Sequence, residues 1–252
     1  GSAKEMLSQL EKEEADWDVA FGVSADALEE GKEYWQTGKD AWTGYSAVSF
    51  VILYNTNVVT YRELPTGWDS LLEPRWKGRV AVPDPLKSDM AASVLTEAAK
   101  NSEKEEFLDL LAENMQYQMP ETFKEVEQGI SDGRYSIGVT SEEAAKAMLA
   151  AGQDVDYIDP EEGECFFEDG TAIRKRTPNL DASEAFVTYT TCDDTKWLLR
   201  TQLLRQPAED VAAENDRSDE DLKQRYSRQQ EVLNIWKLIM EEKSGSAHEQ
   251  EQ

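Results

Sequence analysis

Three segments of this chain place small polar residues directly between a β-rich run and a helical pattern. They read VAFG before VSADAL, VAVPDP before LKSDMAASVL, and SIGVT before SEEAAKAM. The first N–H groups of a helix lack partners within the helix and lie at the positive end of its dipole, so such junctions bind anions. In a parallel sheet these junctions share one edge, so they are expected to converge on one crevice. The candidate ligand-binding residues there are Gly22, Val23, Ser24, Lys87, Ser88, Asp89, Thr140, Ser141 and Glu142.

Each junction has a chemical reason and a structural alternative. Gly22 permits close approach of the backbone to a ligand. Lys87 adds a positive charge to its loop, Thr140 offers a hydroxyl, and Glu142 can meet a cationic group. The alternative is that Ser24, Ser88 and the Thr140–Ser141 pair are ordinary N-caps of the helices that follow.

The densest basic cluster of this acidic chain is Arg174, Lys175 and Arg176. Alternation along a strand puts Arg174 and Arg176 on one face and Lys175 on the other. Arg174 is therefore a further candidate for pairing with an anionic ligand. A surface ion pair with neighbouring carboxylates is the alternative.

Composition excludes several classes of function. The 252 residues carry 52 acidic and 26 basic side chains, a formal charge of -26, which repels nucleic acid and anionic lipid. His248 is the one histidine, so neither a histidine-based triad nor a multi-histidine metal site is available, and no metal or cofactor is predicted. Cys165 and Cys192 lack C-x-x-C spacing, which leaves one disulfide or two free thiols open. No run approaches the roughly 18 apolar residues of a membrane span.

The elements that must position these residues alternate between short β-rich runs and longer helical patterns. Strands are expected at 17–22, 47–55, 78–85, 135–140, 155–159 and 171–175. This alternation predicts an α/β protein with a largely parallel sheet. Core-facing stripes are expected on the helices near 90–98, 107–115, 197–204 and 232–239, and a flexible tail at 243–252.

Five segments follow one another in an order that resembles a known family. They are WDVAFGVSADAL, SFVILYNTNVV, LPTGWDSLLEPRWKGRVAVPDPLKSD, GRYSIGVTSEEAAKAMLAAGQDVDYIDPEEG and DGTAIRKRTPNLDASEAFVTYTT. The chain resembles, from about Asp16 to Thr191, the extracytoplasmic solute-binding proteins of ABC importers. The branch it is similar to includes ferric-iron, phosphonate and sugar-phosphate binders. Its middle block contains Trp68 and Trp76, which we expect to be buried.

The resemblance implies a two-lobed type II periplasmic-binding-protein-like fold with mostly parallel sheets and flanking helices. One lobe would comprise 1–46 with 176–242 and the other 56–170, joined by hinge strands 47–55 and 171–175. Family members open with a βαβ unit that has no counterpart here, so the chain is expected to be truncated. A signal peptide or lipid anchor would lie upstream, and the protein would be periplasmic or extracytoplasmic.

The function implied is capture of a small anionic or zwitterionic ligand, such as a phosphonate or sugar phosphate, for the membrane subunits of an ABC transporter. A monomer without enzymatic activity is expected. Iron-binding relatives have two adjacent tyrosines where this chain has Ser141, Glu142 and Glu143, which disfavours tyrosinate iron binding. A ferric-iron-binding protein and the ligand-sensing domain of a receptor remain alternatives. An enzyme on the same fold is less favoured, because no nucleophile–base pairing stands out.

Overall fold

Two long strands and one long helix each have residues in both of the units into which the chain divides. The computed structural model describes residues 2–36, 41–210 and 219–250. The first unit is Gly1–Val48 with Phe167–Arg228, and the second is Ser49–Phe166 with Gln229–Gln252. The division thus differs from the expected lobes, because residues 229–242 belong to the second unit and not to the first.

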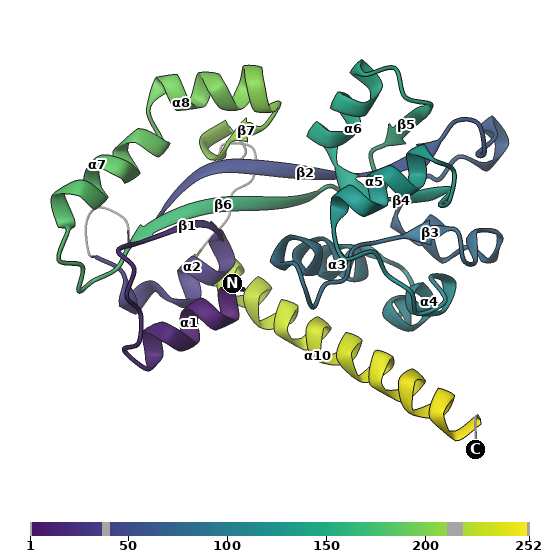
Figure 1. The fold of residues 1–252 in the computed structure, drawn as a ribbon, viewed down its shortest axis with the longest axis horizontal. Helices are drawn as coiled ribbons and strands as arrows, with labels where there is room; N and C mark the ends of the chain where they lie inside the picture. Colours follow the sequence, from purple (N-terminus) through teal and green to yellow (C-terminus); the bar gives the residue numbers. More distant parts are fainter. Residues whose placement is uncertain (1, 37–40, 211–218, 251–252) are drawn as a thin grey trace. The chain divides into compact units, whose positions relative to one another are not determined.

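The first unit combines helices with the strands β1 and β7 and with parts of two longer strands (Figure 1). Its elements are α1 (Ala3–Glu11), β1 (Val19–Ser24), α2 (Ala25–Glu30), η1 (Lys32–Tyr34), α7 (Leu180–Thr190), α8 (Asp193–Leu198), the π-helical turn Leu199–Leu203 and β7 (Gln206–Pro207). The short β7 was not expected from the sequence.

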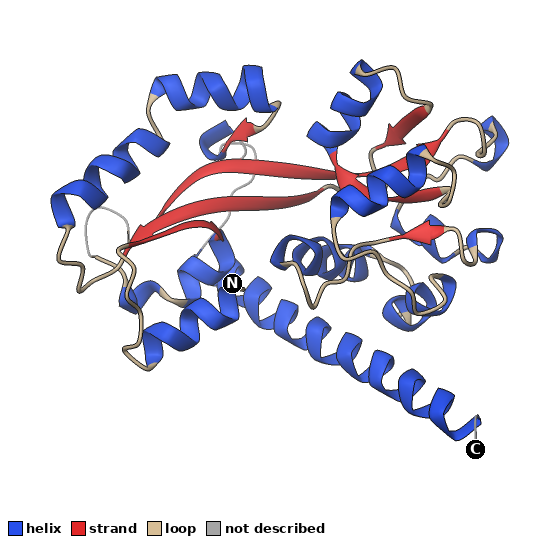
Figure 2. Cartoon of the chain, in the orientation of Figure 1, coloured by secondary structure: helices blue, strands red, loops and turns tan. Residues whose placement is uncertain are grey.

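The second unit contains both helices and strands, which Figure 2 distinguishes by colour. Its elements are η2 (Tyr61–Glu63), η3 (Trp68–Leu72), η4 (Pro74–Trp76), β3 (Val80–Ala81), α3 (Asp89–Asn101), α4 (Phe107–Asn114), α5 (Phe123–Ser131), β4 (Ile137–Ser141), α6 (Glu142–Ala150) and β5 (Val155–Ile158). The elements with residues in both units are β2 (Thr43–Asn55), β6 (Cys165–Ile173) and α10 (Asp219–Gln250). Among the described helices, none is long and apolar enough to cross a membrane.

The described strands follow the order β1-β6-β2-β4-β3, and β5 and β7 also pair with β2. β3 pairs with β4 in parallel. The pairings β1–β6, β2–β4, β2–β5 and β2–β7 are antiparallel. The expectation of mostly parallel sheets is therefore wrong for these pairings, although the α/β class is confirmed. An apolar run indicates that a strand is buried, but it does not indicate whether the neighbouring strand is parallel or antiparallel.

Apolar residues from both strands and helices form the core of each unit. Val51, Leu53, Ala81, Val126 and Ile130 pack together in the second unit, and Leu7, Leu28, Trp35 and Ala172 do so in the first. Trp68 and Trp76 are buried as expected, with 0% and 5% of their surfaces exposed. The indole Nε1 of Trp68 donates to the Gly163 carbonyl over 3.0 Å.

The core stripe expected near residues 197–204, in α8 and the π-helical turn after it, is wrong. Trp197 and Leu203 have 57% and 55% of their surfaces exposed, and Leu198 and Leu204 are exposed as well. Helical spacing identifies an apolar face but not what covers it. On α10, Val232 and Trp236 are buried while Ile235 is exposed. This helix continues to Gln250, and residues 251–252 of the expected flexible tail lie outside the described residues.

Candidate functional site

The carboxyl ends of β3 and β4 lie at one edge of the second unit, because the two strands are parallel. Ser88 is the N-cap of α3 and accepts a hydrogen bond from Ala91 N over 3.2 Å. Ser141 is the N-cap of α6 and accepts from Ala144 N over 3.3 Å. The N-cap interpretation of both serines is confirmed. Each hydroxyl still has its own hydrogen to donate to a ligand oxygen.

A third helix, which the sequence reasoning missed, begins at the same edge. Thr122 is the N-cap of α5 and accepts from Glu125 N over 3.2 Å. The loop before it is tied to the loop before α3, because Asp84 N donates to the Pro120 carbonyl over 2.9 Å. The sequence signal was a threonine followed three residues later by a glutamate, the pattern of a capping box.

Aromatic packing joins the start of α5 to the start of α6. Phe50 on β2 is the register partner of Ser141. Its ring stacks on Phe123, the first residue of α5, with centroids 5.5 Å apart. The N-termini of α3, α5 and α6 therefore form one continuous edge within the second unit. We call this edge the three-helix rim, defined by Ser88, Thr122 and Ser141.

Two candidate side chains at the rim already have polar partners. Lys87 forms an ion pair with Glu121, and this hydrogen bond raises the pKa of the lysine. Thr140 is fully buried and donates its hydroxyl to Glu127 Oε1 over 2.7 Å. We expected the Thr140 hydroxyl to be available to a ligand. In the structure it donates its hydrogen to Glu127 instead, so it cannot also donate to a ligand. Lys87 stays exposed, and an exposed ion pair is weak enough to be exchanged.

Glu142 begins α6 with its carboxylate held by two neighbours. Lys146 Nζ lies 2.7 Å from Glu142 Oε1, one helical turn away. The Tyr157 hydroxyl donates to the same oxygen over 3.5 Å. Burial, followed by the charge of Glu142, raises the pKa of Tyr157, so the phenol keeps its proton at neutral pH. Glu142 is thus one of several carboxylates in the first turns of the rim helices, together with Asp89, Glu125 and Glu143.

The Gly22 corner belongs to the first unit. Gly22 has φ +70, a conformation that favours glycine, and a bulge separates Phe21 from Val23 in the pairing with β6. Ser24 is buried and accepts from Ala27 N over 3.3 Å, so it too is an N-cap. Phe21 stacks on Tyr45 with centroids 4.8 Å apart.

Beside this corner lies a buried charged group that the sequence reasoning did not single out. Asp169, the register partner of Ser24, is 5% exposed. It accepts a hydrogen bond from Ser46 Oγ over 3.0 Å and forms an ion pair with Arg205. Burial and then Asp169 raise the pKa of Tyr45. Asp169 follows several acidic residues in the sequence, Glu161, Glu162, Glu164 and Glu168, so only the fold distinguishes it as a buried, paired charge.

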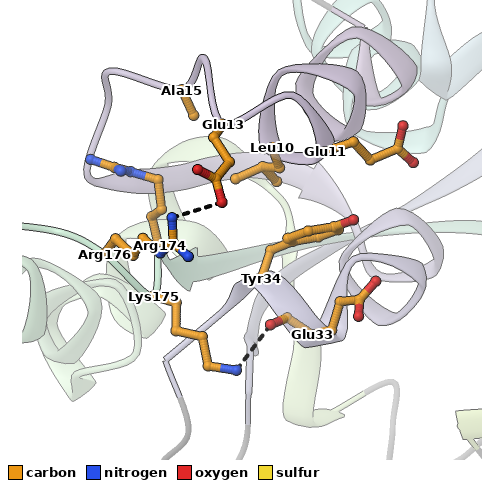
Figure 3. A pocket seen from close by; sticks show the side chains of 9 residues that line it. All are labelled: Leu10, Glu11, Glu13, Ala15, Glu33, Tyr34, Arg174, Lys175 and Arg176. Atoms are coloured by element: carbon orange, nitrogen blue, oxygen red, sulfur yellow. Dashed lines mark hydrogen bonds and ion pairs between the residues drawn. The ribbon is translucent and has the colours of Figure 1, made fainter.

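Arg174 lies in a pocket of the first unit and takes no part in the three-helix rim. Its Nε donates to the Trp17 carbonyl, and its guanidinium is 3.9 Å from Asp18 Oδ1. The pocket has a volume of about 400 Å³ and is drawn in Figure 3. Its lining residues are Leu10, Glu11, Glu13, Ala15, Glu33, Tyr34, Arg174, Lys175 and Arg176.

Two open questions from the sequence concern cysteine and metal chemistry. Cys165 is buried in the second unit, and Cys192 is half-buried in the first. Neither cysteine forms a disulfide, so the disulfide alternative is wrong for this structure. Within the parts of the chain that the structure describes, no three His, Cys, Asp or Glu residues are grouped closely enough to hold a metal ion.

Comparisons with known proteins match nearly the whole chain. A family model described as bacterial extracellular solute-binding protein matches residues 12–230. No curated protein matches the chain. Among solved structures, the periplasmic binding protein P5PA is similar with 17% identity and a TM-score of 0.76, covering 95% of this chain and 89% of that one.

Two further structures have the same fold at similarly low identity. The ferric binding protein from Campylobacter jejuni is 15% identical with a TM-score of 0.76, covering 95% of this chain and 89% of that one. AfuA from Actinobacillus pleuropneumoniae, with exogenous fructose-6-phosphate bound, is 15% identical with a TM-score of 0.77. The similarity covers 95% of this chain and 88% of the AfuA chain. At these identities the likeness establishes the fold alone.

Proposed function

Because the chain belongs to the bacterial extracellular solute-binding protein family, we propose that it binds a small anionic or zwitterionic ligand through the three-helix rim. The family assignment makes it an extracytoplasmic solute-binding protein of an ABC importer, with the type II periplasmic-binding-protein fold. Its partners are therefore a small ligand and the membrane subunits of the transporter. We propose in addition that it has no catalytic activity of its own.

The convergence of three helix N-termini at one edge is the single observation that carries the proposal. The N-caps of helices α3, α5 and α6 are Ser88, Thr122 and Ser141, and side-chain and backbone contacts tie the loops before these helices together. Each start presents N–H groups and positive dipole ends, which favour phosphate, phosphonate or carboxylate groups. Of the other candidates near Ser88, Lys87 lies in the loop before α3 and Asp89 is the first residue of that helix.

The ligand class follows from the charges beside the rim. Exchange of Glu121 for a ligand oxyanion would leave Lys87 paired with that ligand. Glu142 could accept from a cationic group, which makes a zwitterion compatible as well. Gly22, Val23 and Ser24 belong to the first unit, and we propose them separately as residues that can bind a ligand through backbone groups. Arg174 is the least supported candidate, since the Trp17 carbonyl and Asp18 already occupy its guanidinium.

A thermal-shift screen with phosphonates, sugar phosphates, ferric complexes and polyamines tests the proposal. An anionic or zwitterionic ligand at about a hundredfold excess over its Kd stabilises the folded protein by about 2.7 kcal/mol. A melting-temperature shift with such a compound supports the proposal. A shift with ferric complexes alone favours the iron-binding alternative, and a shift with polyamines alone, or none at all, overturns it.

Substituting the capping serine with aspartate separates binding from folding. Aspartate is an N-cap as good as serine, so Ser141→Asp keeps the cap of α6 while it adds a negative charge at the rim. We expect the affinity for an anionic ligand to fall at least about tenfold, with the melting temperature of the free protein nearly unchanged. Ser2→Asp, at the N-cap of α1, is the matched control and leaves the affinity unchanged. Equal affinities of both variants would place the ligand elsewhere.

A further inference from the structure

The pocket beside Arg174 lies entirely within the first unit. The rim residues that we propose to bind the transported ligand belong to the second unit. The pocket lies between the end of α1, the short η1 helix and the residues that follow β6 (Figure 3). Its volume of about 400 Å³ is in the range of small-molecule sites in proteins. The question is which chemistry its lining can recognise.

Basic groups line one part of the pocket. Lys175 Nζ donates to the main-chain carbonyl of Glu33 over 3.1 Å, a neutral acceptor that leaves the ammonium charge uncompensated by this contact. Arg176 forms an ion pair with Glu13 over 2.8 Å, and the two side chains are 74% and 69% exposed. Such an exposed pair contributes little and can be exchanged for a ligand carboxylate.

Acidic groups surround the hydroxyl of Tyr34. Burial, followed by the charges of Glu33 and Glu11, raises the pKa of this tyrosine. The phenol therefore remains protonated at neutral pH, close to two carboxylates that can accept hydrogen bonds from an ammonium group. Between the acidic and basic groups, the ring of Tyr34 and the side chain of Leu10 provide an apolar wall.

We propose that this pocket is a second binding site, one that takes a short zwitterionic peptide of two or three residues with both termini free. Its α-carboxylate would pair with Lys175 and Arg176, and its α-ammonium with Glu11 and Glu33. The three acidic and three basic residues of the lining balance in formal charge. The glutamates would repel a simple anion, and the basic residues would repel a simple cation. A zwitterion can instead form ion pairs with both groups.

Titration of the whole chain with trialanine, followed by calorimetry, tests this site. Trialanine should bind, and either N-acetylation or C-terminal amidation should weaken binding about threefold to tenfold, the range for partly exposed ion pairs. Glu11→Gln and Lys175→Met should weaken it by a similar factor. Both positions are at the surface, and unchanged melting curves would verify that the variants fold.

Matched controls lie on neighbouring residues outside the lining. Glu14→Gln and Lys12→Met change the same charges nearby and should leave the affinity for trialanine unchanged. Ser141→Asp should also leave it unchanged, because that residue belongs to the other unit. Absence of binding, equal affinity for free and doubly capped peptide, or loss of binding in Ser141→Asp would each overturn the proposal. None of these outcomes depends on the identity of the transported ligand.

Discussion

Gln229 donates its side-chain amide to the main-chain carbonyl of Asp89 over 3.2 Å, so helix α10 is fastened to the first residue of α3. The same nitrogen donates to Ser93 Oγ over 3.0 Å. Gln229 is 5% exposed, which protects both bonds from water. A residue near the C-terminus of the sequence thereby positions a helix start that we assign to ligand binding.

Replacement of this glutamine should destabilise the protein. Gln229→Ala leaves the buried Ser93 hydroxyl and the Asp89 carbonyl without this donor, at a cost of about 1–3 kcal/mol. Urea unfolding measures the loss. The control Glu231→Ala, at an exposed position of the same helix, should change stability by less than about 0.5 kcal/mol. Equal losses in the two variants would show that the amide contributes nothing specific.

The half-buried carboxyl of Glu127 should make stability depend on pH. Burial raises the pKa of Glu127 above its ordinary 4.5, against the opposing effect of the hydrogen bond from Thr140. The folded state then holds this proton more tightly than the unfolded state, so stability from this group increases as the pH falls and is lost as the pH rises through the raised pKa. Glu127→Gln removes the titration but keeps an acceptor for Thr140.

Urea unfolding at pH 7 and near pH 4.5 checks the sign of this effect. The stability of the wild type relative to Glu127→Gln should be greater at the lower pH. Exposed Glu105→Gln is the control, and its difference from the wild type should be similar at both values. A wild type that instead loses stability relative to Glu127→Gln on acidification would contradict the assignment of a raised pKa.

Gly138 allows β3 and β4 to approach closely. A methyl group there would lie 2.5 Å from the main-chain oxygen of Ala81 and 2.9 Å from Val126 Cγ1. Because a backbone oxygen cannot rotate away, Gly138→Ala should cost about 1–3 kcal/mol. Ser136→Ala is the comparison, since its buried hydroxyl has no hydrogen-bond partner among the described residues. Thermal unfolding should show that variant to be as stable as the wild type or more so.

The two cysteines should differ in reactivity. A hydrogen bond from Thr195 lowers the pKa of Cys192, which is half-buried, whereas Cys165 is 1% exposed. Native protein treated with a maleimide should therefore be modified first at Cys192, because the accessible thiolate is the nucleophile. Peptide mass spectrometry identifies the site. Modification of Cys165 at the same rate, or of neither thiol, would contradict the structure.

Local sequence was sufficient for the parts of the protein that depend on near neighbours. The approximate places of the strands, the buried Trp68 and Trp76, and the serine caps of α3 and α6 follow from periodicity or from hydrogen bonds over three residues. Strand bounds were less accurate, because β3 has only two residues and β6 begins at Cys165, six residues before the expected start. The ordered segments from Asp16 to Thr191 also predicted the family that the model over residues 12–230 confirms.

The tertiary structure decided whatever depends on residues far apart in the chain. Strand direction, the convergence of Thr122 with Ser88 and Ser141, the burial of Asp169 against Arg205 and the exposure of Trp197 are examples. A periodic pattern records which face of an element is apolar, but burial depends on which other segment packs there. A carboxylate likewise reads as solvated until the fold brings its partner to it, because desolvation and pairing are properties of the assembled neighbourhood.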